Sequence, residues 1–225
     1  MGTFLGHFKR TVLDHGARHD FLRNLKAPAR VLDLGCGSGY NSAVLIEHHP
    51  NVEVHGVDLI DESAVPSFIA YKKIDLNRGE MPYPDEYFDA IVCTHVIEHL
   101  IAPMDLGPEI NRVLKTNGAI YVEAPNWTSM LVPSFGFKRE QHDPFNFFDD
   151  PSHIRPWTRH GLFAFLSQSC ALEVKEVGTV RNWRRILFDA PILIYGLVRG
   201  KRGLVVSSFW NIYGWSIYGV AEKSG

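Results

Sequence analysis

The feature that most constrains this chain is a short apolar run that ends in three closely spaced glycines. The run VLDLGCGSGY predicts a buried strand over 30–34, a turn through Gly35, Gly37 and Gly39, and a helix over about 38–49. Glycines at alternate positions remove the Cβ atoms where a ligand must approach the backbone. The turn also precedes a helix, whose first free N–H groups favour an anionic or electron-rich group. An ordinary strand–helix turn needs only one glycine, so this run predicts a ligand site.

The spacing of the glycines limits the class of ligand that the loop can bind. A dinucleotide fingerprint runs G-x-G-x-x-G, whereas this run is G-x-G-x-G and Tyr40 occupies the sixth position. Asp33 lies two residues before the first glycine, where its carboxylate would repel a pyrophosphate and attract an ammonium group. The loop therefore suits an amino-acid moiety better than a diphosphate. In having an acid followed by G-x-G-x-G, the sequence resembles the first motif of the class I S-adenosylmethionine-dependent methyltransferases.

Further acidic residues lie at the ends of the next two predicted strands, over 52–57 and 71–76. Asp58 lies 23 positions beyond the first glycine, and an acid at the end of a second strand can accept from both ribose hydroxyls. The resemblance implies that Asp75 accepts from the adenine amino group and that Leu76 lies against the ring. A solvated loop acid at Asp58 and a cap or turn acid at Asp75 are the ordinary alternatives. Asp58 by itself does not separate NAD from S-adenosylmethionine.

Strands and helices alternate through the first half of the chain, which predicts a parallel sheet. A fourth strand is predicted over 90–93, a helix over 103–115 that ends at Asn117-Gly118, and a fifth strand over 119–123. Ligands of such sheets bind at the carboxyl ends of the strands. The resemblance implies an α/β fold with a Rossmann-like, doubly wound, mostly parallel seven-stranded sheet and an antiparallel edge hairpin. The predicted S-adenosylmethionine-binding residues are Asp33, Gly35, Cys36, Gly37, Gly39, Asp58, Leu59, Asp75, Leu76 and Thr94.

The whole chain, 1–225, is predicted to form a single methyltransferase domain with a cofactor-binding core over 30–126. Residues 1–29 carry apolar positions at helical spacing and are expected to cover the sheet edge, although in related methyltransferases such a segment can close over the cofactor. Residues 127–157 are irregular and rich in aromatic residues, and are expected to form the acceptor pocket and lid. After the lid the sequence predicts a helix over 158–169 capped by Thr158, a strand over 172–177 and a last strand over 213–222.

Composition excludes several classes of protein. The 225 residues are 45% hydrophobic with a formal net charge of −2, so the chain can bury a core and has no basic excess for nucleic acid. Three widely spaced cysteines fit a reducing compartment, and we find no apolar signal core at the start of the sequence. We therefore expect a cytoplasmic protein.

The segment 181–211 is unusual because apolar runs at 186–188 and 192–198 precede the basic sequence RGKRG. Asp189 and Pro191 are expected to interrupt it, so it is not predicted to be a membrane-spanning helix. Either the segment packs on the domain as an insertion between the last two strands, or it forms an interfacial patch that touches a membrane or a partner protein. Attachment at the periphery of a membrane is thus the alternative to a purely cytoplasmic location.

The sequence HVIEH at 95–99 matches H-x-x-E-H, an inverted zinc-protease pattern, but that pattern needs a helix and here follows a strand directly. The resemblance explains it better, since many class I methyltransferases read V-x-E-H-L at this point. Some relatives hold Mg²⁺ with E-x-x-E-H and a further histidine. Here His95 replaces the first glutamate, and histidine is a poor ligand for a hard cation. No metal is predicted, and Glu98 and His99 are expected to orient the loop through hydrogen bonds.

The acceptor is predicted to be a small molecule or a glycan. The sequence HDPFNFFDDPSHIRPWT, residues 142–158, resembles a segment of methyltransferases found near polysaccharide-biosynthesis functions, which favours a sugar hydroxyl. Small metabolites and quinone-like phenols stay open. The predicted reaction is in-line methyl transfer, for which positioning is the main requirement, and a hydroxyl acceptor also needs a base. The candidate bases are His95, His99, His142 and His153.

Two other functions compete with this prediction. An NAD-dependent oxidoreductase would need a glycine where Tyr40 stands and a catalytic dyad, which we do not find in the sequence. A non-catalytic or membrane-associated S-adenosylmethionine-binding protein is suggested by residues 181–211.

Overall fold

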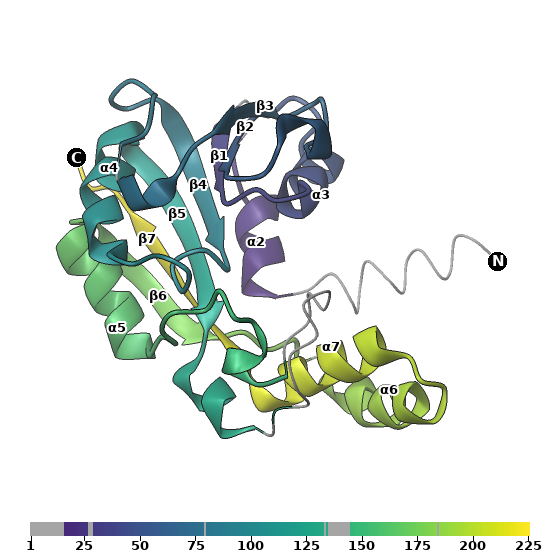
Figure 1. Ribbon diagram of the computed structural model, residues 1–225. Coiled ribbons are helices and arrows are strands. Elements are labelled where there is room, and N and C mark those ends of the chain that lie inside the picture. The colour runs from purple at the N-terminus through teal and green to yellow at the C-terminus, as the bar shows by residue number, and fades with distance from the viewer. Residues whose placement is uncertain (1–15, 27–28, 79, 133, 135–144, 184) are drawn as a thin grey trace.

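The chain folds around one mixed sheet with helices on both faces (Figure 1). This computed structural model describes residues 16–26, 29–78, 80–132, 134, 145–183 and 185–225. The seven strands have the spatial order β3-β2-β1-β4-β5-β7-β6. Strands β1 to β5 pair in parallel, and β7 is antiparallel to both β5 and β6. The predicted α/β fold and its antiparallel edge hairpin are confirmed. The strands are β1 (Arg30–Leu34), β2 (Glu53–Asp58), β3 (Ala70–Lys73), β4 (Phe88–Thr94), β5 (Leu114–Pro125), β6 (Glu173–Thr179) and β7 (Ser216–Glu222).

Alternation along the strands divides the core into two layers. In β1, Leu32 and Leu34 belong to the cluster that contains Ile110 and Leu162. Val31 faces the other way, into the cluster with Leu22 and Leu45. This alternation follows from the two-residue period of a strand. The helices are α2 (Ala17–Arg23), α3 (Tyr40–His48), α4 (Gly107–Val113), α5 (Arg159–Ala164), α6 (Ile186–Val198) and α7 (Arg202–Tyr213).

The glycine turn and its helix lie close to their predicted places. Strand β1 has the predicted bounds, whereas α3 begins at Tyr40, two residues later than predicted. Gly39 is the residue before the helix and has φ 80°, a left-handed conformation that delays the first helical residue. The predicted Thr158 cap is confirmed, because its Oγ1 accepts from the Gly161 N–H at 2.9 Å.

The predicted helix over 103–115 is wrong at its end. A 3₁₀ turn, Pro103–Leu106, leads into α4, which stops at Val113. Asn117 is left-handed, with φ 63°, but lies inside β5 rather than at a helix cap. The Asn117 N–H donates to the Lys223 carbonyl and the Lys223 N–H donates to the Gly118 carbonyl. These bonds to the chain beyond β7 keep the segment in the sheet.

The segment 181–211 contains two helices and not one interrupted run. Helix α6 continues through Asp189 and Pro191, so the predicted interruption is wrong. Pro191 removes the helical donor to the Leu187 carbonyl, and Leu187 and Pro191 both lie on the exposed side of α6. The two helices connect β6 to β7, as expected of an insertion. Of the residues that the structure describes, none belong to a helix long and apolar enough to cross a membrane.

The N-terminal cover expected over 1–29 is described only over 16–26 and at residue 29. There α2 buries Leu22, and the Phe21 ring lies 5.7 Å from the Tyr121 ring of β5. Residues 1–15 and 27–28 lie outside the described residues.

Candidate functional site

A cavity of about 310 Å³ opens at the carboxyl ends of the parallel strands. This strand-end cavity is defined by residues that follow β1, β2, β3 and β4, as the topology requires of a ligand site in such a sheet. Its size is at the lower end of ligand cavities, which span roughly 300–1,000 Å³. Five of the predicted cofactor residues line it: Gly35, Asp58, Leu59, Asp75 and Leu76.

The glycine loop is bound to the second strand by its own backbone. The N–H groups of Gly35 and Cys36 both donate to the Val57 carbonyl, at 2.8 and 3.2 Å. The Gly37 N–H donates to Asp58 Oδ2 at 2.8 Å. Gly35 has φ 69°, and a Cβ there would lie 2.2 Å from Val96 Cγ2. Position 35 therefore needs glycine for both backbone conformation and space.

Asp58 and Asp75 present their carboxylates at the edge of the strand-end cavity. Asp58 Oδ1 accepts from the Leu59 N–H at 2.6 Å, which fixes the orientation of the carboxylate. Asp75 Oδ1 accepts from the Asn77 N–H at 3.0 Å. Leu76 is buried beside Asp75. Both acids are partly exposed and keep acceptor capacity for a ligand.

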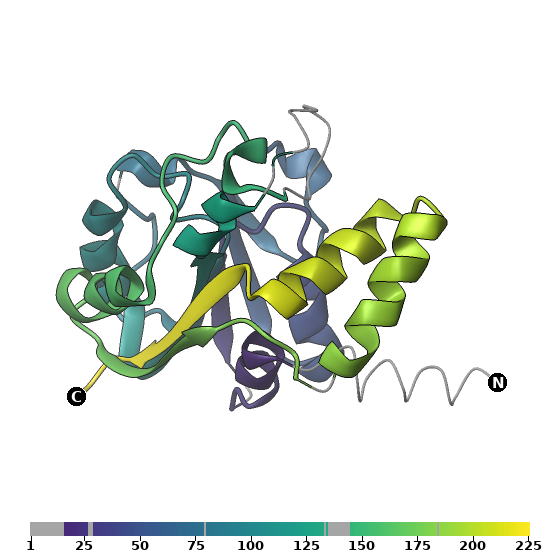
Figure 2. The same cartoon turned by 90° about the horizontal axis from the view of Figure 1, so that it is seen from below.

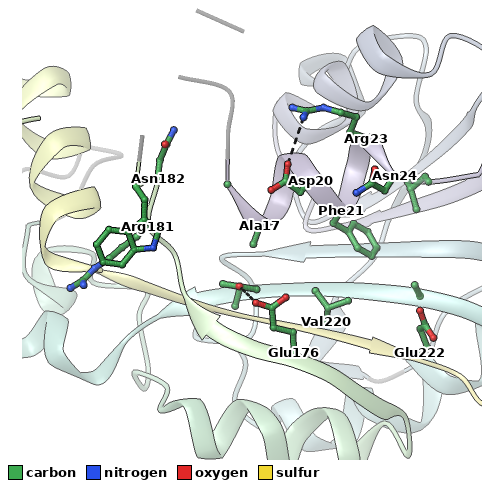
Figure 3. A pocket seen from close by; sticks show the side chains of 15 residues that line it. Ala17, Asp20, Phe21, Arg23, Asn24, Glu176, Arg181, Asn182, Val220 and Glu222 are labelled. Atoms are coloured by element: carbon green, nitrogen blue, oxygen red, sulfur yellow. Dashed lines mark hydrogen bonds and ion pairs between the residues drawn. The ribbon is translucent and has the colours of Figure 1, made fainter. Parts of the chain in front are cut away.

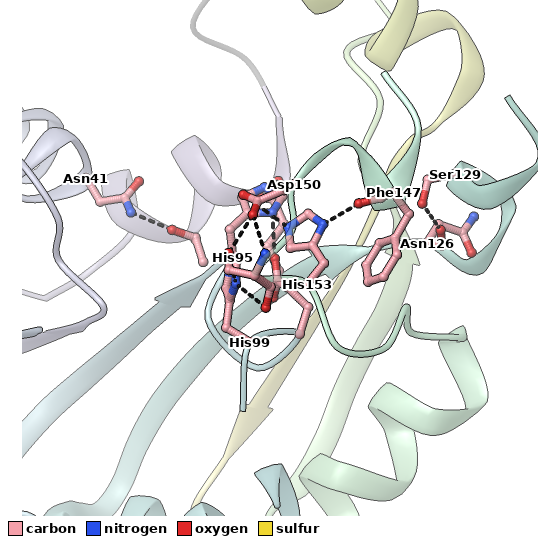
Figure 4. Close-up of polar contacts among 12 residues, drawn as sticks. Asn41, His95, His99, Asn126, Ser129, Phe147, Asp150 and His153 are labelled. Atoms are coloured by element: carbon pink, nitrogen blue, oxygen red, sulfur yellow. Dashed lines mark hydrogen bonds and ion pairs between the residues drawn. The ribbon is translucent and has the colours of Figure 1, made fainter. Parts of the chain in front are cut away.

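The other predicted cofactor residues lie beneath the loop rather than on this cavity. Asp33 is 2% exposed, and its Oδ2 accepts from Ser42 Oγ at 2.7 Å. Burial raises the pKa of Asp33 to about 6, and Oδ1 has no hydrogen-bond partner. Thr94 Oγ1 accepts from Asn41 Nδ2 at 2.7 Å (Figure 4).

Cys36 and Gly39 have supporting positions in the same loop. Cys36 is buried against Gly56, where an added Cβ would come within 2.7 Å of Cys36 Sγ. Burial raises the pKa of the Cys36 thiol to about 12, so it stays protonated. The Gly39 N–H donates to the Cys36 carbonyl at 2.8 Å.

His95 lies between two buried carboxylates. Its Nδ1 lies 3.2 Å from Glu98 Oε1 and its Nε2 lies 3.3 Å from Glu123 Oε1. Burial lowers the pKa of His95, but the hydrogen bonds to Glu123 and Glu98 outweigh it and raise the pKa to about 10. His95 is therefore an imidazolium at neutral pH, with both ring N–H groups engaged. It has no lone pair with which to accept a proton.

A second cavity, of about 570 Å³, lies on the other side of His95. Of the described side chains, His95 is the one that lines both this second cavity and the strand-end cavity. Helix α2 contributes Arg18 to the second cavity and α7 contributes Trp210. Burial raises the pKa of Glu123, but the charge of Arg18 and the hydrogen bond from His95 lower it to about 2.

Arg18 and Glu123 were not predicted as site residues. Glu123 had a usable signal, since it lies near the carboxyl end of a strand like the predicted acids. No sequence signal marks Arg18 as a site residue, because only the packing of α2 on the sheet brings its side chain to the end of β5.

Two more histidines lie beside the strand-end cavity. His99 Nδ1 lies 3.0 Å from Ser152 Oγ, and His153 Nδ1 lies 2.6 Å from the Phe147 carbonyl (Figure 4). Burial lowers the pKa of His153, which favours the neutral ring. Of these two, His99 lines the cavity. The fourth candidate base, His142, lies outside the described residues.

Glu98, His99 and His153 are close enough to share a metal ion. One ligand atom from each lies within 4.8 Å of the others, and the buried Glu98 Oε2 has no hydrogen-bond partner. The loop over 95–99 is not helical, so the helix that the zinc-protease pattern needs is absent from these residues. The absence of a metal stays a prediction.

A third cavity, of about 780 Å³, lies away from the strand ends. It lies between α2 and the β7–β6 edge, with Phe21 and Val220 on its walls and Asp20 paired to Arg23 (Figure 3). None of the predicted cofactor residues line it.

The chain matches a family model and several curated proteins. A family model described as a methyltransferase domain matches residues 6–165. A probable S-adenosylmethionine-dependent methyltransferase of Mycobacterium tuberculosis is 35% identical over 181 residues, which are 77% of this chain and 61% of the relative. A trans-aconitate 2-methyltransferase of Pseudomonas paraeruginosa is 29% identical over 109 residues, 46% of this chain and 38% of the relative. The matches thus span about two fifths to three fifths of these relatives.

Solved structures share the fold at low sequence identity. A Mesorhizobium loti S-adenosylmethionine-dependent methyltransferase has a TM-score of 0.62 and 19% identity, covering 93% of this chain and 99% of that one. The [4+2]-cyclase SpnF has a TM-score of 0.59 and 17% identity, covering 91% and 80%. The fold alone therefore does not determine the reaction.

Proposed function

The chain belongs to the methyltransferase-domain family, and from this premise we propose that it transfers the methyl group of S-adenosylmethionine to a hydroxyl of a small molecule or sugar. The observation that carries the proposal is the strand-end cavity, where Gly35, Asp58 and Asp75 converge from three strands. The relatives named as S-adenosylmethionine-dependent support the choice of cofactor. Because this chain matches only part of their length, its activity and acceptor are proposals.

The residues present fit this cofactor. Asp58 suits the ribose hydroxyls, because its carboxylate lies at the cavity edge and is already oriented by three backbone N–H groups. Asp75 suits the amino group of the adenine ring, and Leu76 suits its apolar face. Asp33 Oδ1 is a buried acceptor without a hydrogen-bond partner, and it is available to a water that bridges to an ammonium group. When bound, S-adenosylmethionine supplies an electrophilic methyl carbon on a sulfonium.

We assign His99 as the residue that takes the proton from an acceptor hydroxyl. His95, the other predicted base on the strand-end cavity, is cationic and has no free lone pair. The Ser152 hydroxyl and carbonyl, both close to His99 Nδ1, hold the ring in place. His95 instead keeps a positive charge on the wall shared by the two cavities, next to Glu123.

The second cavity is our candidate for the part of the acceptor site that holds the body of the acceptor, whose reacting hydroxyl reaches past His95 to His99 on the strand-end cavity. It adjoins the strand-end cavity at His95 and combines the Trp210 ring with charged groups, a lining that suits a polar molecule with an apolar face. The sugar hydroxyl rests on the resemblance of residues 142–158. Relatives named for trans-aconitate and for ubiquinone biosynthesis show that acceptors vary among similar proteins.

Calorimetry with S-adenosylmethionine and with NAD tests the cofactor. We expect the protein to bind S-adenosylmethionine and not NAD. Asp58→Ala should weaken the affinity for S-adenosylmethionine about 5- to 150-fold, because a bound ribose hydroxyl would lose its acceptor. Asp61→Ala, which removes an exposed acid three residues away, is the matched control and should leave the affinity unchanged. Binding of NAD without binding of S-adenosylmethionine would overturn the proposal.

Labelled-methyl transfer into a cell extract, followed by mass identification of the product, tests the acceptor. With the acceptor known, His99→Gln should lower kcat about 10²- to 10⁴-fold, the usual contribution of a general base. His160→Gln, on the exposed side of α5, is the control and should keep full activity. Label appearing only on nitrogen or carbon would overturn transfer to a hydroxyl.

A further inference from the structure

The helical hairpin of α6 and α7 carries an exposed apolar face that methyl transfer does not use. On α6, Leu187 is 80% exposed, Ile194 60% and Val198 78%, and Pro191 is exposed between them. Spacings of four, three and four residues place these side chains in one stripe. Phe188 and Tyr195 flank the stripe and are also exposed. We call Leu187, Pro191, Ile194 and Val198 the α6 outer face.

The opposite side of α6 packs against α7, and the two buried residues of α6 are Asp189 and Gly196. Gly196 approaches α7 so closely that an added Cβ would lie 2.8 Å from Val205 Cγ2. Asp189 is buried there, with its Oδ1 2.8 Å from Arg185 Nε and its Oδ2 accepting from Asn211. Both views show the hairpin extending from the body, on the side opposite α5 (Figures 1 and 2). The outer face therefore points away from the domain.

The exposed charges of the hairpin have one sign. Asp189 is the only acid between 181 and 213, and it is buried. The turn between the helices places Arg199 and Lys201 in exposed positions beside the end of the α6 outer face. An apolar stripe that ends in exposed cations, with no exposed carboxylate, complements the surface of an anionic bilayer.

We propose that the α6 outer face and the Arg199–Lys201 turn dock the protein on a bilayer that contains anionic lipids. With 13 residues, α6 is about 20 Å long and lies in the plane of the interface rather than across it. The side chains of the outer face offer no hydrogen-bonding group. A protein interface usually holds about one hydrogen bond per 100–200 Å². This composition favours lipid over a second protein surface, and it holds whatever acceptor the chain methylates.

Flotation of the full chain with vesicles tests the proposal. We expect binding to vesicles of phosphatidylcholine mixed with an equal amount of phosphatidylglycerol, and little binding to phosphatidylcholine alone. The double variant Arg199→Gln, Lys201→Gln should weaken binding about 30-fold, at roughly fivefold per cation. The double variant Ile194→Ser, Val198→Ser should weaken it about tenfold or more. Both pairs are exposed, so these variants should fold normally.

Matched controls lie elsewhere on the surface. Phe163→Ser changes an exposed apolar residue of α5, and Lys26→Glu changes an exposed cation after α2; neither should alter vesicle binding. Absence of binding by the unmodified chain, or equal binding by the α6 variants, would overturn the proposal. A dimer that Val198→Ser dissociates in light scattering would overturn it too, by assigning the face to a second copy of the chain.

Discussion

The strand-end cavity and the α6–α7 hairpin are held in place in opposite ways. The cavity residues are held to the sheet by hydrogen bonds from backbone N–H groups: Gly35 donates to the Val57 carbonyl and Gly37 to the Asp58 carboxylate. The hairpin is joined to the body at its base and leaves a whole apolar face in contact with solvent. The first arrangement suits a ligand that must meet fixed groups. The second suits a surface that needs only area and charge. Substitutions should therefore be costly in the first region and cheap in the second.

The largest effect should follow loss of the His95 cation. His95→Ala leaves the Glu98 and Glu123 carboxylates buried without their shared partner, which should lower the free energy of unfolding by about 3–5 kcal/mol. Urea unfolding measures this change, with His160→Ala on the exposed side of α5 as the control. Equal stability of the two variants would mean that the ion triplet of Glu98, His95 and Glu123 does not stabilise the fold.

The same triplet predicts a pH dependence. The pKa of His95 is raised from its ordinary value near 6.5 to about 10 in the folded chain. Its contribution to stability is thus fully present below 6.5 and is lost as the pH rises through about 10. Unfolding curves of the unmodified chain should show this decline across alkaline pH, and those of His95→Gln should show less of it. Parallel curves would contradict the assigned charge.

The next effect should come from the glycine turn. Gly35→Ala brings a Cβ to within 2.2 Å of Val96 Cγ2 and forces alanine into φ 69°, which should cost about 3 kcal/mol. Gly37→Ala, with φ 48° and no atom within 4 Å of the added Cβ, should cost only the backbone term of about 1 kcal/mol. Thermal unfolding of the pair measures the difference. A Gly37 variant as unstable as the Gly35 variant would show that crowding by Val96 is not the cause.

The smallest effect should come from the hairpin. Ile194→Ser and Val198→Ser change exposed side chains, so stability should shift by less than about 0.5 kcal/mol each. Thermal unfolding without lipid measures this. A large loss would end the contrast between the regions, because it would show that the α6 outer face is buried in the protein as it exists in solution.

The sequence predictions were accurate where structure depends on neighbouring residues and less accurate where it depends on distant ones. The bounds of β1 and the Thr158 cap depend on neighbouring residues, and both were predicted correctly. The end of the helix before β5 was missed, because Asn117 is held by Lys223 from the far end of the chain. The continuity of α6 through Pro191 was missed because propensity rules treat proline as a helix breaker, whereas Pro191 lies within the first six residues of α6 and on its exposed side.

Within the candidate site, the predicted positions of Asp58 and Asp75 follow from the rule that parallel strands end at one edge. The cationic state of His95 could not be predicted from its motif, since it arises from Glu123 on the neighbouring strand. The role of Arg18 likewise depends on how α2 docks. Local motifs thus predict which side chains lie at the site, whereas tertiary packing determines the pKa values of those side chains.

Helix α7 has two roles: Ser207, Trp210 and Asn211 line the second cavity, and Val205 and Asn211 contact Gly196 and Asp189 of α6. Both helices lie beyond residues 6–165, the part that matches the family pattern. On the proposal that the second cavity holds the acceptor, exchange of this one insert would change acceptor selectivity. The residues proposed to bind S-adenosylmethionine lie within residues 6–165 and would be left unchanged by that exchange.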